Sequence, residues 1–330
     1  MIQLNPFVEK VLRTVESHRL SEGVYCRWLW QNEIGDRELG ANEYGCADAA
    51  NILYSIGHFP RDPEARAHWV RALQDMQNPQ TGLFTEKTHH TIHTTAHCVA
   101  ALELFDAQPL YPLHDLKQYL GHDQLRAMLS SLNWDHNPWP QSHQGAGLFA
   151  SLIITRMCDP AWQDAYFTWL KENADPETGL GLRGRRGTAP LAHQLYGWFH
   201  YLFNHVHAHR PFPYPEKIID SCISLYENRD LSPVFSREVG FMEIDWIFAM
   251  NRASRQTPHR FSEVKALLSD MAHDFLPWLM SLDETSHDMF NDLHMLFGAV
   301  CAAAELQLAL PGQILTDVPL KNVLDRRPFI

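Results

Sequence analysis

The feature that most constrains the fold is a repeated pairing of helices along the chain. Segments predicted to be amphipathic helices alternate with segments that are apolar nearly all round, and turns rich in Pro and Gly separate many of them. Two turns have similar chemistry, Asn-Pro-Gln-Thr-Gly-Leu at 78–83 and Asp-Pro-Glu-Thr-Gly-Leu at 175–180. Because a helix that is apolar on all sides must be buried on all sides, such repeats have to pack against one another.

The pattern predicts an all-α protein made of six helical hairpins. Six inner helices surrounded by six outer ones form a closed (α/α)6 toroid, and we expect the inner helices near residues 44–57, 92–106, 143–157, 190–204, 240–254 and 287–308. No linker divides the chain, so residues 1–310 are predicted to be a single domain. Residues 311–330 contain three prolines and are predicted to form an extended C-terminal strap.

One polar residue recurs at the start of each predicted inner helix, at intervals of 46 to 52 residues. In a closed toroid these side chains would form a ring of carboxylates and imidazoles. Asp and His are the side chains that exchange protons near neutral pH. The predicted catalytic residues are therefore Asp48, His97, His143, His193, Asp245 and His294.

Candidates for ligand binding flank this ring. His89 and His93 precede His97 at helical spacing, on the same face. Parallel helix N-termini favour an anionic ligand, and arginine is the usual clamp for carboxylate or phosphate. Aromatic side chains supply stacking walls for a sugar or an apolar group. The predicted substrate-binding residues are His89, His93, Arg183, Arg185, Arg237, Trp139 and Trp246, with Arg186 in the same basic loop.

A metal site is the alternative role for the histidines. His93 and His97 have the i, i+4 spacing of zinc-binding helices, but Thr94 stands where those helices carry the general-base Glu. We therefore expect no cofactor, and the pair His93 and His97 is the candidate if zinc binds.

Charge and composition restrict the partners. A net charge of -12 and the lack of a basic run argue against nucleic-acid binding. We expect no membrane span, because the longest apolar stretches are too short. Six widely scattered cysteines are typical of reduced thiols, which favours a cytoplasmic protein. The expected partner is a small-molecule or oligosaccharide substrate.

The six hairpins and their turns resemble the α/α toroids, which include terpenoid cyclases, protein prenyltransferase β subunits, N-acylglucosamine 2-epimerases and several sugar hydrolases and lyases. His93-Thr94-Thr95-Ala96 stands where terpenoid cyclases carry Asp-Asp-Thr-Ala, so the acid that protonates an alkene is replaced. Resemblance to the epimerases and sugar lyases implies that histidines and carboxylates of the inner helices act as acid and base.

The leading prediction is a carbohydrate-active enzyme, an epimerase, lyase or hydrolase, that binds an acidic or phosphorylated sugar at the mouth of the toroid. Hydrolysis would call for two carboxylates beside the bond, and the ring offers Asp48 with Asp245. The alternatives are an isoprenoid enzyme of the terpenoid-cyclase type and a non-catalytic binding or scaffold protein.

Overall fold

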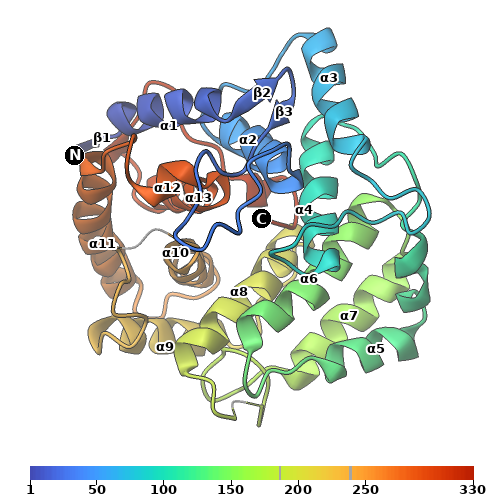
Figure 1. Ribbon diagram of the computed structural model, residues 1–330. Coiled ribbons are helices and arrows are strands. Elements are labelled where there is room, and N and C mark those ends of the chain that lie inside the picture. Colours follow the sequence, from blue (N-terminus) through green and yellow to red (C-terminus); the bar gives the residue numbers. More distant parts are fainter. Residues whose placement is uncertain (186, 238–239) are drawn as a thin grey trace.

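The computed structural model describes residues 1–185, 187–237 and 240–330, and helices dominate it (Figure 1). Six of the described helices are called inner helices here because others lie outside them: α2 (Glu43–Ser55), α4 (Thr91–Leu104), α6 (Pro138–Ile154), α8 (Leu191–His207), α10 (Met242–Ser254) and α13 (Leu293–Ala309). Each inner helix packs against the next in this order, and α13 packs back against α2.

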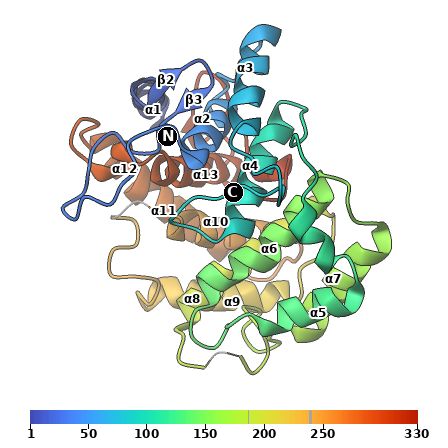
Figure 2. The same ribbon diagram turned by 45° about the vertical axis from the view of Figure 1, so that its right-hand side comes forward.

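The outer helices are α1 (Asn5–Ser17), α3 (Pro63–Gln74), α5 (His122–Ser131), α7 (Pro160–Asn173), α9 (Pro215–Glu227) and α11 (Phe261–Ser281). Figures 1 and 2 show α5 and α7 on the outer side of α6, and α9 below α10. Short elements complete the description: η1 (His114–Tyr119), α12 (Asp288–Asn291), η2 (Val323–Asp325), and the strands β1 (Ile2–Gln3), β2 (Arg19–Ser21), β3 (Val24–Tyr25) and β4 (Ile314–Leu315).

The inner helices are buried as their composition predicts. All residues from 44 to 52 in α2 and from 296 to 306 in α13 are buried. Small side chains allow this close packing: α13 carries Gly298 and a run of three alanines at 302–304. A helix that is buried on all sides can carry a polar side chain only where a neighbouring helix supplies a hydrogen-bond partner for it.

Two of the predicted helix boundaries differ from the structure. The helix expected near 143–157 begins earlier, at Pro138, because proline is well suited to a first helical turn. The helix expected near 287–308 is interrupted at Asp292, which separates α12 from α13. The Asp292 carboxylate accepts a hydrogen bond of 2.9 Å from the backbone N–H of His294 and so caps α13.

The C-terminal segment, residues 311–330, contains the strand β4 and the short helix η2. Its strand β4 pairs in parallel with β1, so the beginning of this segment lies beside the first residues of the chain. Beyond η2, however, Phe329 and Ile330 are buried, and Figure 1 places the C-terminus among the inner helices.

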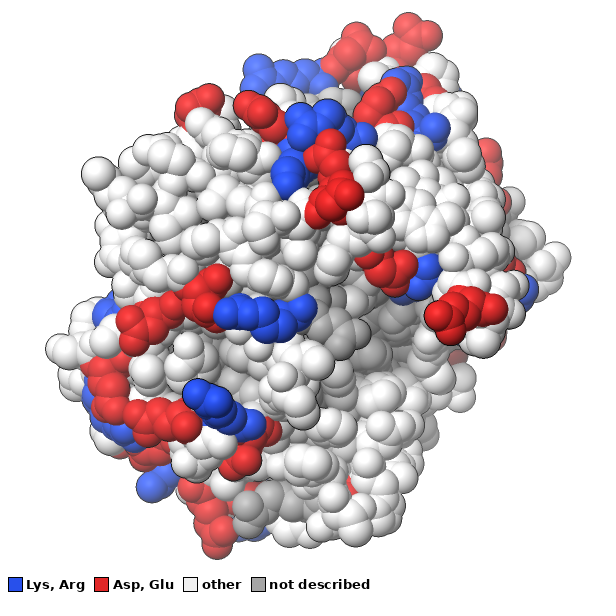
Figure 3. Space-filling view, turned by 60° about the vertical axis from the view of Figure 1, so that its left-hand side comes forward, with Lys and Arg blue, Asp and Glu red and all other residues white. Residues whose placement is uncertain are grey.

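None of the described helices combines the length and the apolarity needed to cross a bilayer. On the face drawn in Figure 3, basic and acidic side chains are intermixed and no extended basic surface is seen.

The turn at 78–83 provides a test of the packing between its glycine and the next loop. Gly82 has φ +75°, and a Cβ there would lie 1.9 Å from the carbonyl oxygen of Pro112. Gly35 has a similar φ of +70° with nothing within 4 Å. We expect Gly35→Ala to lower the free energy of unfolding in urea by about 1–2 kcal/mol, the cost of the left-handed backbone alone. Gly82→Ala should cost at least about 2 kcal/mol more. If both variants lose the same free energy of unfolding, the loop around Pro112 moves away from the new methyl group at no cost.

Candidate functional site

A cavity of about 360 Å³ lies between the inner helices and is lined mainly by histidine and apolar side chains. We call it the histidine cavity. Several of its residues belong to the first turns of inner helices, so the helix N-termini surround it. Its lining comprises Arg27, His89, His93, Trp139, His143, His200, Gly240, Phe241, Met242, His294, Met295 and Ile330.

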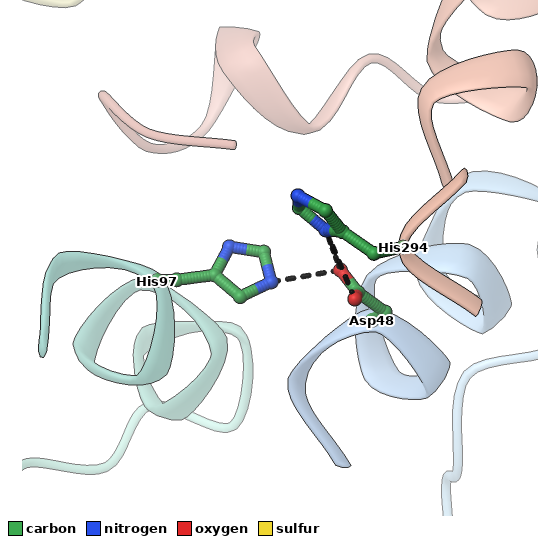
Figure 4. A group of neighbouring side chains, drawn as sticks. All are labelled: Asp48, His97 and His294. Atoms are coloured by element: carbon green, nitrogen blue, oxygen red, sulfur yellow. Dashed lines mark hydrogen bonds and ion pairs between the residues drawn. The ribbon is translucent and has the colours of Figure 1, made fainter. Parts of the chain in front are cut away.

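Asp48 of α2 joins three inner helices beside this cavity (Figure 4). Its Oδ1 lies 2.7 Å from Nε2 of His97 in α4, and its Oδ2 lies 3.1 Å from Nδ1 of His294 in α13. Asp48 and His97 are fully buried, whereas His294 reaches the cavity. An ionised carboxylate only accepts hydrogen bonds, so both imidazoles donate to it. This fixes their tautomers, and Nε2 of His294 is left with its lone pair.

Burial sets the charges of this group. Burial by itself would raise the pKa of Asp48, but the two imidazoles lower it below its usual range, so the carboxylate is ionised. Burial lowers the pKa of His294 to about 4 and that of His97 in the same direction, although Asp48 opposes both changes. At neutral pH the group is therefore a carboxylate held by two neutral imidazoles.

A second set of oriented imidazoles belongs to the same cavity. The buried hydroxyl of Tyr44 bonds to Nδ1 of His93. When the hydroxyl donates, His93 carries its proton on Nε2. The ring of His143 lies 4.3 Å from that of His93 and 4.5 Å from that of His200, between ring centres. Burial lowers the pKa of all three histidines.

Local sequence explains these positions. Tyr44 and Asp48 are four residues apart on α2, and His93 and His97 are four apart on α4, so each pair shares one helix face. The Tyr44 ring stacks on His97, with centres 4.9 Å apart, and on His89, with centres 4.5 Å apart. Spacing of four residues on two adjacent helices therefore produces a layered stack of rings.

Arg27 lines the cavity, but its charge is already paired. Its Nε lies 2.9 Å from Oδ1 of Asp292 and its Nη2 lies 3.1 Å from Oδ2, while Nη1 donates to the Thr88 hydroxyl at 2.7 Å. A bidentate pair of this kind anchors the loop to the start of α13. Arg27 thus helps to position His294, and a ligand anion would have to compete with Asp292.

The structure brings together four of the six predicted catalytic residues, not the whole ring. Asp48 contacts both His97 and His294, and His143 lines the same cavity as His294. His193 is exposed, in the first turn of α8. Asp245 is buried away from the group, and burial together with Glu243 raises its pKa well above the usual range.

The predicted substrate-binding residues divide in the same way. His89, His93 and Trp139 line the histidine cavity. The other four do not. Arg185 pairs with Asp135 at 2.6 Å, Arg237 pairs with Asp274, and Trp246 is fully buried with its indole N–H donated to Cys222. Arg183 lines a separate surface pocket, and Arg186 lies outside the described residues.

Sequence reasoning missed three residues of the site. His200 lies seven residues, two helical turns, after His193 and so on the same face of α8, and that spacing could have marked it as a second candidate further along the helix. Tyr44 could have been found from its four-residue spacing to Asp48. No local pattern distinguishes Arg27 from other loop arginines.

One set of described residues could also hold a metal ion. The ligand atoms of Asp48, His97 and His294 all lie within 4.8 Å of one another. His93, half of the zinc pair expected from the sequence, is bonded to Tyr44 instead. Comparison with protein-family models, curated proteins and solved structures gave no match, so the resemblance to the toroid families stays a prediction.

Neutral buried histidines make stability depend on pH. Burial lowers the pKa of His200 to about 3 and that of His205 to about 4, below the value of about 6.5 for the unfolded chain. The unfolded state therefore binds more protons, and stability is complete above about pH 6.5 and falls as the pH approaches 4. Each histidine should cost about 1.4 kcal/mol per pH unit in that window.

We expect urea unfolding at pH 5.0, 5.5, 6.0 and 7.5 to show this slope, and His205→Asn to make it shallower. The exposed His273 is the control, and His273→Asn should leave the slope unchanged. A wild-type stability that is flat across this range would contradict the burial of neutral imidazoles.

Proposed function

We propose that the protein is an enzyme built on a six-hairpin α/α toroid, and that it moves a proton to and from a carbon atom of a sugar bound in the histidine cavity. The observation that carries the proposal is the buried Asp48, which accepts hydrogen bonds from His97 and His294 at the wall of that cavity. The closed succession of contacts from α2 through α13 and back to α2 supports the toroid.

His294 is the proposed base. Asp48 holds its proton on Nδ1, so Nε2 can accept a proton from a substrate carbon, and the carboxylate stabilises the imidazolium that results. His93 is the proposed proton donor: as its Nε2 gives a proton to the substrate, its Nδ1 takes the proton of the Tyr44 hydroxyl, so the imidazole stays neutral and the phenolate is reprotonated when His294 gives up the proton it has taken. The acid returns a proton to the opposite face of the carbon in an epimerisation, or protonates the departing oxygen in a β-elimination.

The lining of the cavity favours these reactions over hydrolysis. Glycoside hydrolysis normally uses two carboxyl groups flanking the bond. Among the described residues that line the histidine cavity none is Asp or Glu, and Asp245 lies away from it. The imidazoles are the groups that remain for proton transfer.

A small acidic sugar fits this cavity best. Its volume is at the lower end of the roughly 300–1,000 Å³ typical of small-molecule sites. Trp139 and Phe241 offer aromatic faces, and the imidazoles offer donors and acceptors for hydroxyl groups. A carboxylate on the substrate would also raise the lowered pKa of His294 and so strengthen it as a base. An isoprenoid would leave these polar nitrogens without partners.

Deuterium exchange tests the proposal without prior choice between epimerisation and elimination. Hexuronic acids, hexuronate-containing disaccharides, N-acetylhexosamines and hexose phosphates would be incubated with the protein in D2O and analysed by mass spectrometry. We expect at least one sugar to gain deuterium at carbon or to lose a leaving group. His294→Asn should slow this at least 10²-fold, as loss of a general base does. His193→Asn, at an exposed predicted position, should leave it unchanged. If every sugar is returned unlabelled and intact, the proposed function is wrong.

A metal centre at Asp48, His97 and His294 is the competing use of the same residues, because their ligand atoms lie within 4.8 Å of one another. The charge of the surroundings disfavours it. Arg327 is fully buried, and its positive charge already lowers the pKa of His97, so a divalent ion would add positive charge beside it.

We therefore expect elemental analysis of the purified protein to find no stoichiometric transition metal, and chelator treatment to leave deuterium exchange unchanged. If the protein contains stoichiometric zinc that is lost in His97→Asn but kept in His193→Asn, Asp48, His97 and His294 form a metal centre and not a hydrogen-bonded group.

A further inference from the structure

A second cavity, of about 320 Å³, lies beside the C-terminal end of α8. We call it the α7–α8 pocket, because its lining comes from α7, from the end of α8 and from residues 210–213. Five residues advance an α-helix by about 140°, so His200 can face the histidine cavity while His205 faces the α7–α8 pocket. No described residue lines both cavities. The second cavity is therefore a site of its own.

His205 is the buried polar group of this pocket, with 2% of its surface exposed. Its Nδ1 lies 2.8 Å from the carbonyl oxygen of Tyr201, and because a carbonyl only accepts, Nδ1 carries the proton. Burial lowers the pKa of His205 to about 4, so the ring is neutral at neutral pH and Nε2 keeps its lone pair. No described residue donates a hydrogen bond to Nε2. A buried acceptor of this kind calls for a donor from outside the chain.

Two phenylalanine rings form apolar walls around this imidazole. The ring of Phe167 is inclined to it by 66°, with centres 4.8 Å apart, and the ring of Phe212 by 89°, with centres 6.1 Å apart. The backbone N–H of Phe212 donates to Oε1 of Gln256 at 2.8 Å, and the prolines on both sides of Phe212 fix their own φ angles. The walls are thus in place before a ligand binds, which lowers the entropic cost of binding.

The exposed edge of the pocket carries an excess of positive charge. Arg210 pairs with Asp164, whereas Lys171 has no ion-pair partner among the described residues. Two cations against one carboxylate leave one positive charge in excess, in a chain whose net charge is -12. This local reversal of sign favours a ligand with a single negative charge at its outer end.

We propose that the α7–α8 pocket binds a small aromatic carboxylic acid that also carries a hydroxyl or N–H group. The hydroxyl or N–H donates to Nε2 of His205 at the buried end. The aromatic ring packs against Phe167 and Phe212, and the carboxylate meets Lys171 at the exposed edge. The volume lies at the lower end of the roughly 300–1,000 Å³ typical of small-molecule sites, which suits a compact ligand. This second site does not depend on the reaction proposed for the histidine cavity.

Calorimetric titration with matched probes tests each contact. 4-Hydroxybenzoate places a donor and a carboxylate at opposite ends of one ring, benzoate lacks the donor, and 4-hydroxybenzyl alcohol lacks the charge. We expect 4-hydroxybenzoate to bind most tightly, and about 3- to 10-fold more tightly than benzoate, which is the worth of one hydrogen bond between neutral groups. If 4-hydroxybenzoate does not bind, or binds no more tightly than benzoate, the proposal is wrong.

Substitution of His205 locates the hydrogen bond. His205→Phe keeps an aromatic ring in the buried position but removes the acceptor, so it should abolish the preference for 4-hydroxybenzoate over benzoate. The matched control is His207→Phe, which changes a histidine of the same helix outside the lining and should keep the preference. A preference that survives in His205→Phe would show that the acid binds elsewhere.

Substitution of Lys171 tests the charge and is independent of the buried position, because this side chain is exposed and its loss should not affect folding. Lys171→Met should weaken the binding of both acids several-fold and leave that of 4-hydroxybenzyl alcohol unchanged. Lys217→Met, at an exposed lysine outside the lining, should change neither. Equal binding of the acids to Lys171→Met and Lys217→Met would overturn the assignment, even if His205→Phe fails to fold.

Discussion

The buried carboxylate of Asp48 is the interaction on which the rest of the site depends. An ionised group with no access to water must receive hydrogen bonds from its neighbours, and here one comes from α4 and one from α13. The requirement fixes how these two helices lie against α2. The capping of α13 by Asp292, itself held by Arg27, adds a second restraint at the same helix start. Packing and proton chemistry thus use the same contacts.

The surroundings then decide what these groups can do. Apolar walls keep the imidazoles neutral, and a neutral imidazole with a fixed tautomer is either a donor or an acceptor, never both at one nitrogen. Asp48 makes His294 an acceptor toward the cavity, while Tyr44 makes His93 a donor. The two imidazoles are therefore chemically different although both belong to histidines of one cavity. Such an asymmetry is what acid–base chemistry on a single bound molecule requires.

The sequence predicts the helices better than the site. The inner helices are apolar over three or four turns, and that pattern places α2, α4 and α8 close to their observed ranges. Spacing along the chain also selected Asp48, His97 and His294. It did not bring His193 or Asp245 to the cavity, because a recurring interval marks where each helix starts but not how far a side chain there lies from the cavity. His200, rather than His193, meets the cavity. Arg27 and Arg327 come from segments without regular structure, where no period indicates which side chains turn inward.

The separation of these contacts along the chain has a consequence for biosynthesis. Asp48 and His294 are 246 residues apart, and Arg27 and Asp292 are 265 apart. Contacts between such distant residues form late, since a long loop must close before they are gained. While the ribosome is still making α10, the carboxylate of Asp48 has only His97 as a partner. The nascent chain must therefore carry a half-satisfied buried acid, or leave α2 open, until α13 emerges.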